Sequence, residues 1–310
     1  MAEIDFRVIN RLAENPKEAI NKAEDEYHAH IKGLARKIAD NPQIKIILLA
    51  GPSGSGKTTS ANMLADTLRA YDESVLVVSL DDFYKNSDDP SYPRTENGER
   101  DYECPESLHL DDVLGTLGRI TSGLDFEIPK YDFKTASRTK TRKYPPISHG
   151  CVIIEGLHAL NPKISDPLPR EKILKLFVSV STNINDGNKR ILSGRKLRFI
   201  RRMVRDSIYR GADAKRTLEM WKDVLYAEDL YLYPYKETAD VSFDTFHAFE
   251  PCVMSSFAKN LISEELEKSD PYAAVVINAI RKIKEIDVHA VPQNSLIREF
   301  IPGGIYENLY

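Results

Sequence analysis

Runs of consecutive apolar residues alternate along the chain with more polar segments of helical periodicity. The runs have the length of strands and cover residues 44–50, 75–80, 151–154 and 174–180, with a shorter run at 241–243. Uninterrupted apolar runs are typical of strands that are buried on both faces of a parallel sheet. Because predicted helices separate these runs, the pattern predicts an α/β fold with a doubly wound parallel sheet.

Two regions depart from this rhythm. Residues 1–42 place apolar side chains at helical spacing and end at Asn41-Pro42, which predicts a helical extension. Residues 83–150 are rich in Tyr, Pro, Asp and Arg, and long excursions of this kind carry substrate contacts. Within them we expect a helix over about 106–122 and a hairpin that pairs 127–131 with 138–144.

The second half of the chain has a helical character. Residues 189–222 predict a helix rich in Arg and Lys, and residues 251–286 predict one or two amphipathic helices. Residues 291–310 contain two prolines and two glycines and predict an irregular strap that packs on the surface.

A glycine-rich segment joins the first predicted strand to a predicted helix. Residues 51–58 read GPSGSGKT and match the pattern GxxxxGK[ST], which is a phosphate-binding P-loop. Glycines let backbone N–H groups turn toward phosphate oxygens, and the positive end of the helix dipole favours the same anion. Lys57 is then placed to reach the β- and γ-phosphates, and Thr58 to ligate Mg²⁺. We expect ATP to bind at Gly51, Pro52, Ser53, Gly54, Ser55, Gly56, Lys57, Thr58 and Thr59.

Acidic residues follow two of the predicted strands. Asp81 comes directly after residues 75–80, and Glu155 comes directly after residues 151–154. The carboxyl ends of parallel strands face the ligand crevice, so we expect both carboxylates near the triphosphate. There they can hold Mg²⁺, and Asp81 can accept a proton from an attacking hydroxyl.

Arginines crowd one predicted helix. Arg198, Arg201, Arg202 and Arg205 lie three or four residues apart, which places them on one helix face. Their mutual repulsion is a cost that bound phosphate would offset, so we favour a lid over ATP. A solvated basic face and an RNA-binding face are the alternatives.

Composition narrows the class of protein. The chain has 310 residues, of which 42% are hydrophobic, and its net charge of −4 argues against a wholly basic nucleic-acid surface. Its 3 cysteines have no metal-binding spacing and suit a reducing compartment. No signal peptide or long apolar run stands out, so we expect a cytoplasmic protein without a membrane span.

Seven short stretches, taken in order, resemble the uridine kinase and phosphoribulokinase group of P-loop kinases, and above all its uridine/cytidine kinase branch. They are GPSGSGKT (51–58), VSLDDFY (78–84), YECP (102–105), YDF (131–133), SR (137–138), IIEG (153–156) and RRMVRD (201–206). The resemblance covers residues 44–245 and implies a P-loop kinase fold that uses Mg²⁺ and ATP.

The resemblance implies roles for individual residues. Asp81 matches the catalytic base, and Lys57 and Arg202 complete the expected catalytic set. Thr58, Asp81 and Glu155 match the Mg²⁺ positions. The lid residues Arg205 and Arg210 match arginines that reach ATP phosphates, and the implied acceptor-binding residues are Tyr84, Glu103, Tyr131, Arg138 and Arg202.

Two positions depart from the uridine/cytidine kinase pattern. Ala136 stands where that branch has a histidine that reads the pyrimidine edge, and Met220 where it has a glutamine. An alanine cannot hydrogen-bond a base and a methionine is a weak acceptor, so the kinase chemistry transfers better than the base specificity.

The implied reaction is transfer of the γ-phosphate of ATP to a nucleoside, with the 5′-hydroxyl of uridine or cytidine as acceptor. The alternatives are a kinase of the same fold for a sugar phosphate or vitamin precursor, a nucleotide-gated RNA- or protein-binding module, and a plain ATPase. We expect no membrane or nucleic-acid partner, and homo-oligomer formation is left open. The expected organisation is an N-terminal extension (1–42), a kinase domain (43–250, with an acceptor-binding region at 83–150 and a lid at 186–215) and C-terminal helices with a tail (251–310).

Overall fold

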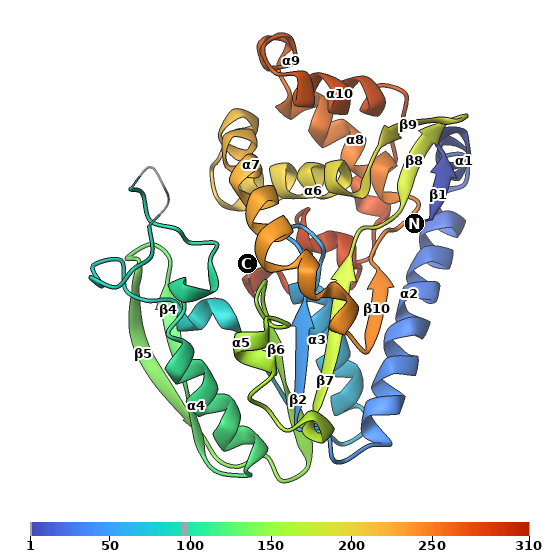
Figure 1. Ribbon diagram of the computed structural model, residues 1–310. Helices are drawn as coiled ribbons and strands as arrows, with labels where there is room; N and C mark the ends of the chain where they lie inside the picture. The colour runs from blue at the N-terminus through green and yellow to red at the C-terminus, as the bar shows by residue number, and fades with distance from the viewer. Residues whose placement is uncertain (1, 95–97, 310) are drawn as a thin grey trace.

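The computed structural model describes residues 2–94 and 98–309. At its centre is a five-stranded parallel sheet in the order β10-β7-β2-β6-β3 (Figure 1). Its strands are Ile46–Ala50 (β2), Ser74–Ser79 (β3), Gly150–Glu155 (β6), Ile173–Ser179 (β7) and Val241–Asp244 (β10). Each lies within two residues of an apolar run in the sequence. The predicted parallel sheet is confirmed.

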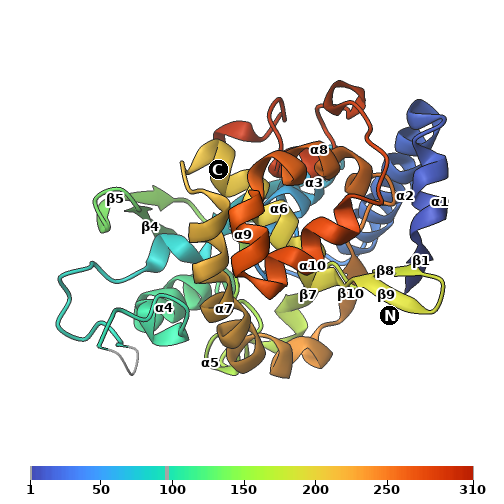
Figure 2. The same ribbon diagram turned by 90° about the horizontal axis from the view of Figure 1, so that it is seen from above.

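Helices cover both faces of this sheet and gather above the carboxyl ends of its strands (Figures 1 and 2). They are Phe6–Leu12 (α1), Pro16–Ala39 (α2), Lys57–Arg69 (α3), Leu110–Thr121 (α4), Pro162–Ser165 (α5), Gly194–Tyr209 (α6), Ala214–Tyr231 (α7), Glu250–Leu261 (α8), Glu264–Ser269 (α9) and Pro271–Ile280 (α10).

The two faces of the central strand β2 enter separate hydrophobic cores. Ile47 and Leu49 belong to the core that contains α2 and α3. Ile46 and Leu48 belong to the core that contains α4 and α5. All of these side chains are fully buried, which explains why the strand is apolar at every position. The fold is therefore doubly wound, as predicted.

Two smaller sheets complete the structure. The expected hairpin is present as β4 (Phe126–Asp132) and β5 (Ser137–Tyr144), on the side of the molecule away from α2 (Figure 1). The other sheet pairs β1 (Glu3–Asp5) in parallel with β8 (Asn183–Asp186), which pairs in turn with β9 (Lys189–Leu192).

This sheet changes two expectations. The N-terminal segment is not wholly helical, and residues 189–192 form a strand where the sequence predicted a helix. Helix α6 begins after Ser193, whose hydroxyl accepts a hydrogen bond from the N–H of Lys196. The pairing of β1 with β8 joins segments about 180 residues apart, and local periodicity carries no signal for such a contact.

The C-terminal segment also differs from its prediction. Three helices, α8, α9 and α10, stand where one or two were expected. Of the predicted surface strap, residues 291–301 are largely buried, whereas most of residues 302–308 are exposed. Leu296, Ile297, Phe300 and Ile301 are each 0% exposed, and a buried side chain of this size contributes about 1.5–3 kcal/mol. We refer to residues 291–301 as the strap.

The N-terminal helix α2 and the strap reach the same part of the sheet. The Tyr27 hydroxyl of α2 lies 2.7 Å from Ser60 Oγ in the second turn of α3. Glu24, one turn earlier in α2, is 4% exposed, and its Oε1 lies 4.0 Å from Nε2 of the buried His247. Burial raises the pKa of Glu24 to about 7, against the opposing effect of the Ser295 hydroxyl of the strap.

Glu24 makes stability depend on pH. Its pKa is higher in the folded state than the value of 4.5 in an unfolded chain, so its stabilising contribution is complete below about pH 4.5 and is lost as the pH rises through 7. Glutamine does not titrate, and Glu24→Gln should gain about 3 kcal/mol in unfolding free energy relative to the unmodified protein between pH 4.5 and 8. Urea unfolding across this range measures the difference.

The control is Glu26→Gln, which removes an exposed carboxylate from the same helix. Its unfolding free energy should follow that of the unmodified protein at every pH. Parallel curves for Glu24→Gln would contradict the prediction.

Among the residues that the structure describes, no helix has the length and apolar character needed to span a membrane.

Candidate active site

The P-loop connects β2 to α3 at the carboxyl edge of the parallel sheet. Gly54 and Gly56 adopt left-handed backbone conformations, with φ of +72° and +84°. A Cβ atom on Gly54 would lie 2.8 Å from the carbonyl oxygen of Arg198, so a larger residue is excluded by contact as well as by conformation. The glycine pattern in the sequence therefore reflects both the turn and the close approach of α6.

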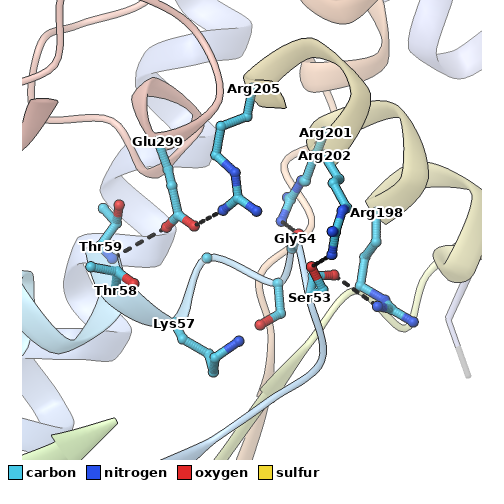
Figure 3. A network of polar contacts seen from close by, with 12 residues as sticks. Ser53, Gly54, Lys57, Thr58, Thr59, Arg198, Arg201, Arg202, Arg205 and Glu299 are labelled. Atoms are coloured by element: carbon cyan, nitrogen blue, oxygen red, sulfur yellow. Dashed lines mark hydrogen bonds and ion pairs between the residues drawn. The ribbon is translucent and has the colours of Figure 1, made fainter. Parts of the chain in front are cut away.

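Side chains hold the carbonyl groups of the P-loop, and three of the four donors lie outside the loop. The carbonyl oxygens of four successive residues accept hydrogen bonds: Pro52 from Lys57 Nζ (3.2 Å), Ser53 from Arg198 Nη1 (2.8 Å), Gly54 from Arg201 Nη1 (3.3 Å) and Ser55 from Thr245 Oγ1 (2.6 Å). Figure 3 shows the two arginines reaching the loop from α6. Carbonyls fixed on the outer side of a loop favour N–H groups on its inner side, the arrangement that binds phosphate.

Arg198 and Arg201 are not part of an exposed basic face. Both are 0% exposed and form buried ion pairs, Arg198 with Glu228 of α7 (2.8 Å) and Arg201 with Glu250 of α8 (2.9 Å between Nε and Oε1). The prediction that four arginines share one lid face is wrong for these two, because α6 is packed on more than one side. Fully buried guanidinium groups are also unable to form an RNA-binding face.

Three further arginines, Arg202 and Arg205 of α6 and Arg210 at its C-cap, surround a single buried carboxylate. Asp206 is 1% exposed and accepts from Arg202 Nε (3.2 Å) and from Nη1 of Arg210 (3.1 Å), with Arg205 Nε at 3.9 Å. Arg202 also donates to Ser53 Oγ of the P-loop (2.9 Å). The repulsion among these arginines is therefore already offset by protein groups, whereas the sequence suggested that phosphate was needed for this.

The two predicted strand-end carboxylates lie close to the P-loop lysine. Glu155 ends β6 and is 7% exposed; burial raises its pKa to about 7, and the charges of Lys57 and Asp81 act on it from nearby. Asp81 follows the adjacent strand β3 and remains open to solvent. Desolvation by the surrounding protein raises the pKa of Asp81, and the nearby Lys57 charge opposes this rise.

A divalent cation fits this group of residues. Two carboxylates with raised pKa values and one hydroxyl, that of Thr58, offer the oxygen ligands that Mg²⁺ prefers, and a cation would favour their ionised forms. Among the described residues, no three His, Cys, Asp or Glu side chains are grouped as a protein-only metal site. Mg²⁺ commonly takes one or two carboxylates from the protein and the rest of its coordination from phosphate and water.

The predicted acceptor residues lie beside Asp81. Tyr84 and Tyr131 are in ring contact (centroids 5.6 Å apart), and the largely exposed Phe133 contacts both rings edge-on. Burial raises the pKa of Glu103, and the nearby Arg202 charge opposes this rise. The region thus combines an aromatic surface with a carboxylate within electrostatic range of Asp81, a combination that suits a ring with hydroxyl groups.

Arg138 has a different environment from the other acceptor candidates. Its guanidinium donates to the carbonyl oxygens of Phe83 (3.0 Å) and Tyr84 (3.2 Å) and to Asp112 (2.6 Å). These bonds tie β5 of the hairpin to the segment that carries Asp81 and Tyr84. We therefore favour a positioning role for Arg138 over direct contact with the acceptor.

The family model of the phosphoribulokinase/uridine kinase family matches residues 46–249. The chain belongs to this family. The match covers the parallel sheet, the P-loop, the hairpin and α6, and it confirms the resemblance drawn from the seven motifs. It leaves out α1 and α2 at one end and α8, α9, α10 and the strap at the other.

Curated relatives are similar over the same part of the chain. Uridine kinase-like protein 4 of Arabidopsis thaliana is 29% identical over 198 residues, which cover 63% of this chain and 37% of the relative. Uridine kinase of Staphylococcus epidermidis is 28% identical over 202 residues, which cover 64% of this chain and 86% of the relative. The chain thus spans less than half of the plant protein's length.

Among solved structures, the "possible uridine kinase" of Bacillus stearothermophilus is similar with a TM-score of 0.45 and 20% sequence identity. The similarity covers 71% of this chain and 100% of that chain.

The two positions that depart from the uridine/cytidine kinase pattern lie in ordered structure. Ala136 occupies the turn of the β4–β5 hairpin with a φ of +49°, and its carbonyl accepts from the N–H of Ser87 (2.9 Å). Met220 lies on α7 and is partly buried, next to the buried Trp221. Neither side chain offers a strong hydrogen-bonding group to a base.

Several residues of the site carried no recognised signal in the sequence. Glu228 accepts from the N–H of Ser53 (2.8 Å) as well as from Arg198, and Thr245 binds both Ser55 and Arg201. Glu299 of the strap contacts Thr59 and Arg205. An available signal was the excess of arginine in α6, because arginines that become buried require acidic partners elsewhere in the chain.

Proposed function

We propose that this protein is an ATP-dependent kinase that transfers the γ-phosphate to the 5′-hydroxyl of a nucleoside, with uridine or cytidine as the expected acceptor. The observation that carries the proposal is the position of Asp81 between the P-loop lysine and the acceptor candidates Tyr84 and Glu103. A pure nucleotide-binding module would not need a carboxylate at this point.

Asp81 acts in this proposal as the general base. Its side chain is exposed and lies near the P-loop lysine, so the carboxylate is accessible to the attacking hydroxyl. Lys57 donates to the Pro52 carbonyl in this structure and would turn toward the β- and γ-phosphates when the triphosphate binds. Asp81 would then take the proton of the attacking hydroxyl, while Lys57 would neutralise charge on the phosphate that is transferred.

Mg²⁺ would be held by Thr58, Asp81 and Glu155, and when bound it supplies positive charge that neutralises the β- and γ-phosphate oxygens. Arg202, Arg205 and Arg210 would stabilise the charge that develops on the transferred group. We propose residues 186–215, which carry these arginines, as the lid, and residues 83–150 as the acceptor-binding region of a kinase domain over residues 43–250. We also propose a cytoplasmic location, which three buried and unpaired cysteines support.

An acceptor panel tests the proposed function. ADP release from ATP is measured with uridine, cytidine, adenosine, guanosine, thymidine, ribose derivatives, sugar phosphates and vitamin precursors. Stimulation by a nucleoside supports the proposal, and its product should be the 5′-monophosphate. Stimulation by a sugar phosphate or vitamin precursor alone would replace the nucleoside with another acceptor. ADP release that no acceptor stimulates would indicate an ATPase.

Glu103 gives a prediction about acceptor binding. Glu103→Gln should raise the KM for the nucleoside by roughly 10- to 100-fold, because a charged hydrogen-bond acceptor for ribose hydroxyls is lost. The KM for ATP should stay close to its original value. Glu99→Gln removes an exposed carboxylate from the same region and serves as the control. Equal changes in both KM values would place Glu103 outside the acceptor site.

A further inference from the structure

The strap packs against the P-loop region, although Thr59 and Glu299 are 240 residues apart in sequence. Leu296 packs closely on Gly56 of the P-loop. A Cβ atom at position 56 would lie 2.9 Å from the Leu296 side chain. The Phe300 ring lies beneath two arginines of α6, at 5.0 Å from Arg201 Cζ and 5.9 Å from Arg205 Cζ. The strap is therefore a wall of the nucleotide site.

One carboxylate of the strap points into that site. Glu299 is 3% exposed; its Oε2 accepts a hydrogen bond from the backbone N–H of Thr59 (3.2 Å), and its Oε1 accepts from Arg205 Nη1 (3.3 Å). Figure 3 shows Glu299 bridging the first turn of α3 and the arginine of α6. The bridge connects the phosphate-binding loop to the proposed lid.

Both partners of Glu299 are groups that a triphosphate would need. The N–H of Thr59 lies in the first turn of α3, where the helix dipole and the backbone N–H groups favour an anion. Arg205 is one of the arginines proposed to bind ATP phosphates. A carboxylate and a phosphate oxygen use the same donors, so they compete for them.

We propose that Glu299 is an internal anionic competitor for the phosphates of the nucleotide. It occupies the Thr59 N–H and the Arg205 guanidinium until a nucleoside triphosphate binds, and it then withdraws and releases both donors. This proposal rests on the nucleotide site of the proposed function but not on the identity of the acceptor. Its consequence is that lid closure by Arg205 is coupled to occupation of the P-loop.

The exchange takes place at the side chain and not by release of the strap. Leu296, Ile297, Phe300 and Ile301 are fully buried, and detaching the strap would expose all four. Rotation of the Glu299 side chain exposes none of them. The strap thus stays in place while its carboxylate moves away from the phosphate.

The test is the affinity for the non-hydrolysable nucleotide AMP-PNP with Mg²⁺, measured by isothermal titration calorimetry without any acceptor. Glu299→Gln keeps the size of the side chain and removes its charge, so it should bind AMP-PNP about fivefold more tightly, or tighter still. Glu307→Gln is the matched control, because Glu307 is a carboxylate of the same C-terminal segment that bonds to Tyr209 and the Gly303 N–H. Its affinity should not change.

The outcomes separate this proposal from the others. A Glu299→Gln protein that binds AMP-PNP equally or more weakly, while the unmodified protein binds it, overturns the competitor role and leaves the nucleotide site standing. If this variant does not fold, Glu299→Asp decides, since its shorter side chain withdraws the carboxylate and should also tighten binding. Failure of every form to bind overturns the nucleotide site together with this proposal, and a silent acceptor panel affects neither.

Discussion

Replacing Asp81 with asparagine is expected to lower the turnover of phosphoryl transfer by about 10²–10⁴-fold, the range that general-base catalysis contributes. Asparagine retains the size of the side chain but cannot take the proton of the attacking hydroxyl. The affinity for ATP should change far less than the turnover, because the P-loop backbone, Lys57 and the other proposed Mg²⁺ ligands, Thr58 and Glu155, remain in place. Steady-state kinetics with the best acceptor, together with AMP-PNP titration, measures both quantities.

Asp82 provides the control for this experiment, because it is the neighbouring carboxylate with a different environment. It pairs with Lys130 (3.0 Å) and accepts from the backbone N–H of Tyr131 (3.3 Å), so it joins the hairpin to the segment after β3. Asp82→Asn should therefore lose far less turnover than Asp81→Asn. Equal losses in the two variants would show that the segment is disrupted, and the assignment of Asp81 as the base would be wrong.

The places of Asp81 and Glu155 at the ends of buried strands could be predicted, because such strand ends are marked locally in the sequence. An acidic residue directly after an apolar run indicates where the strand ends. Parallel pairing then brings the carboxyl ends of these strands to the same edge of the sheet. The P-loop is local for the same reason, since its glycines, its lysine and the helix that follows are contiguous. Local sequence therefore contains enough information to place the strands of the parallel sheet, the β4–β5 hairpin and the P-loop, but not the strands of the small sheet formed by β1, β8 and β9.

The arginines of α6 were harder to place because helical spacing defines a face but not what covers it. Arg198 and Arg201 are buried, and each forms an ion pair with a glutamate that lies 30 or 49 residues further along the chain. Glu299 meets Thr59 across 240 residues. Such pairs depend on how whole helices pack, and periodicity within one segment does not contain that information.

Breaking the buried pair of Arg201 should have the largest effect on stability. Arg201→Met is expected to lower the free energy of unfolding by about 3–5 kcal/mol, because it leaves the carboxylate of Glu250 buried without its partner. It also removes donors from the carbonyl oxygens of Gly54 and Thr245 (3.3 and 2.8 Å). Unfolding in urea at constant pH measures the loss.

Two further variants separate the causes of this loss. Arg195 lies on the same helix as Arg201 and forms an exposed ion pair with Asp229 of α7. Arg195→Met should lower the free energy of unfolding by less than about 1 kcal/mol. The double variant Arg201→Met with Glu250→Gln removes the unpaired charge and should recover part of the stability. We also expect Arg201→Met to weaken binding of AMP-PNP, and the double variant should not restore it, because the Gly54 carbonyl would still lack the donor that fixes the loop. If Arg201→Met were as mild as Arg195→Met, the buried arginines would not be what holds the P-loop in shape.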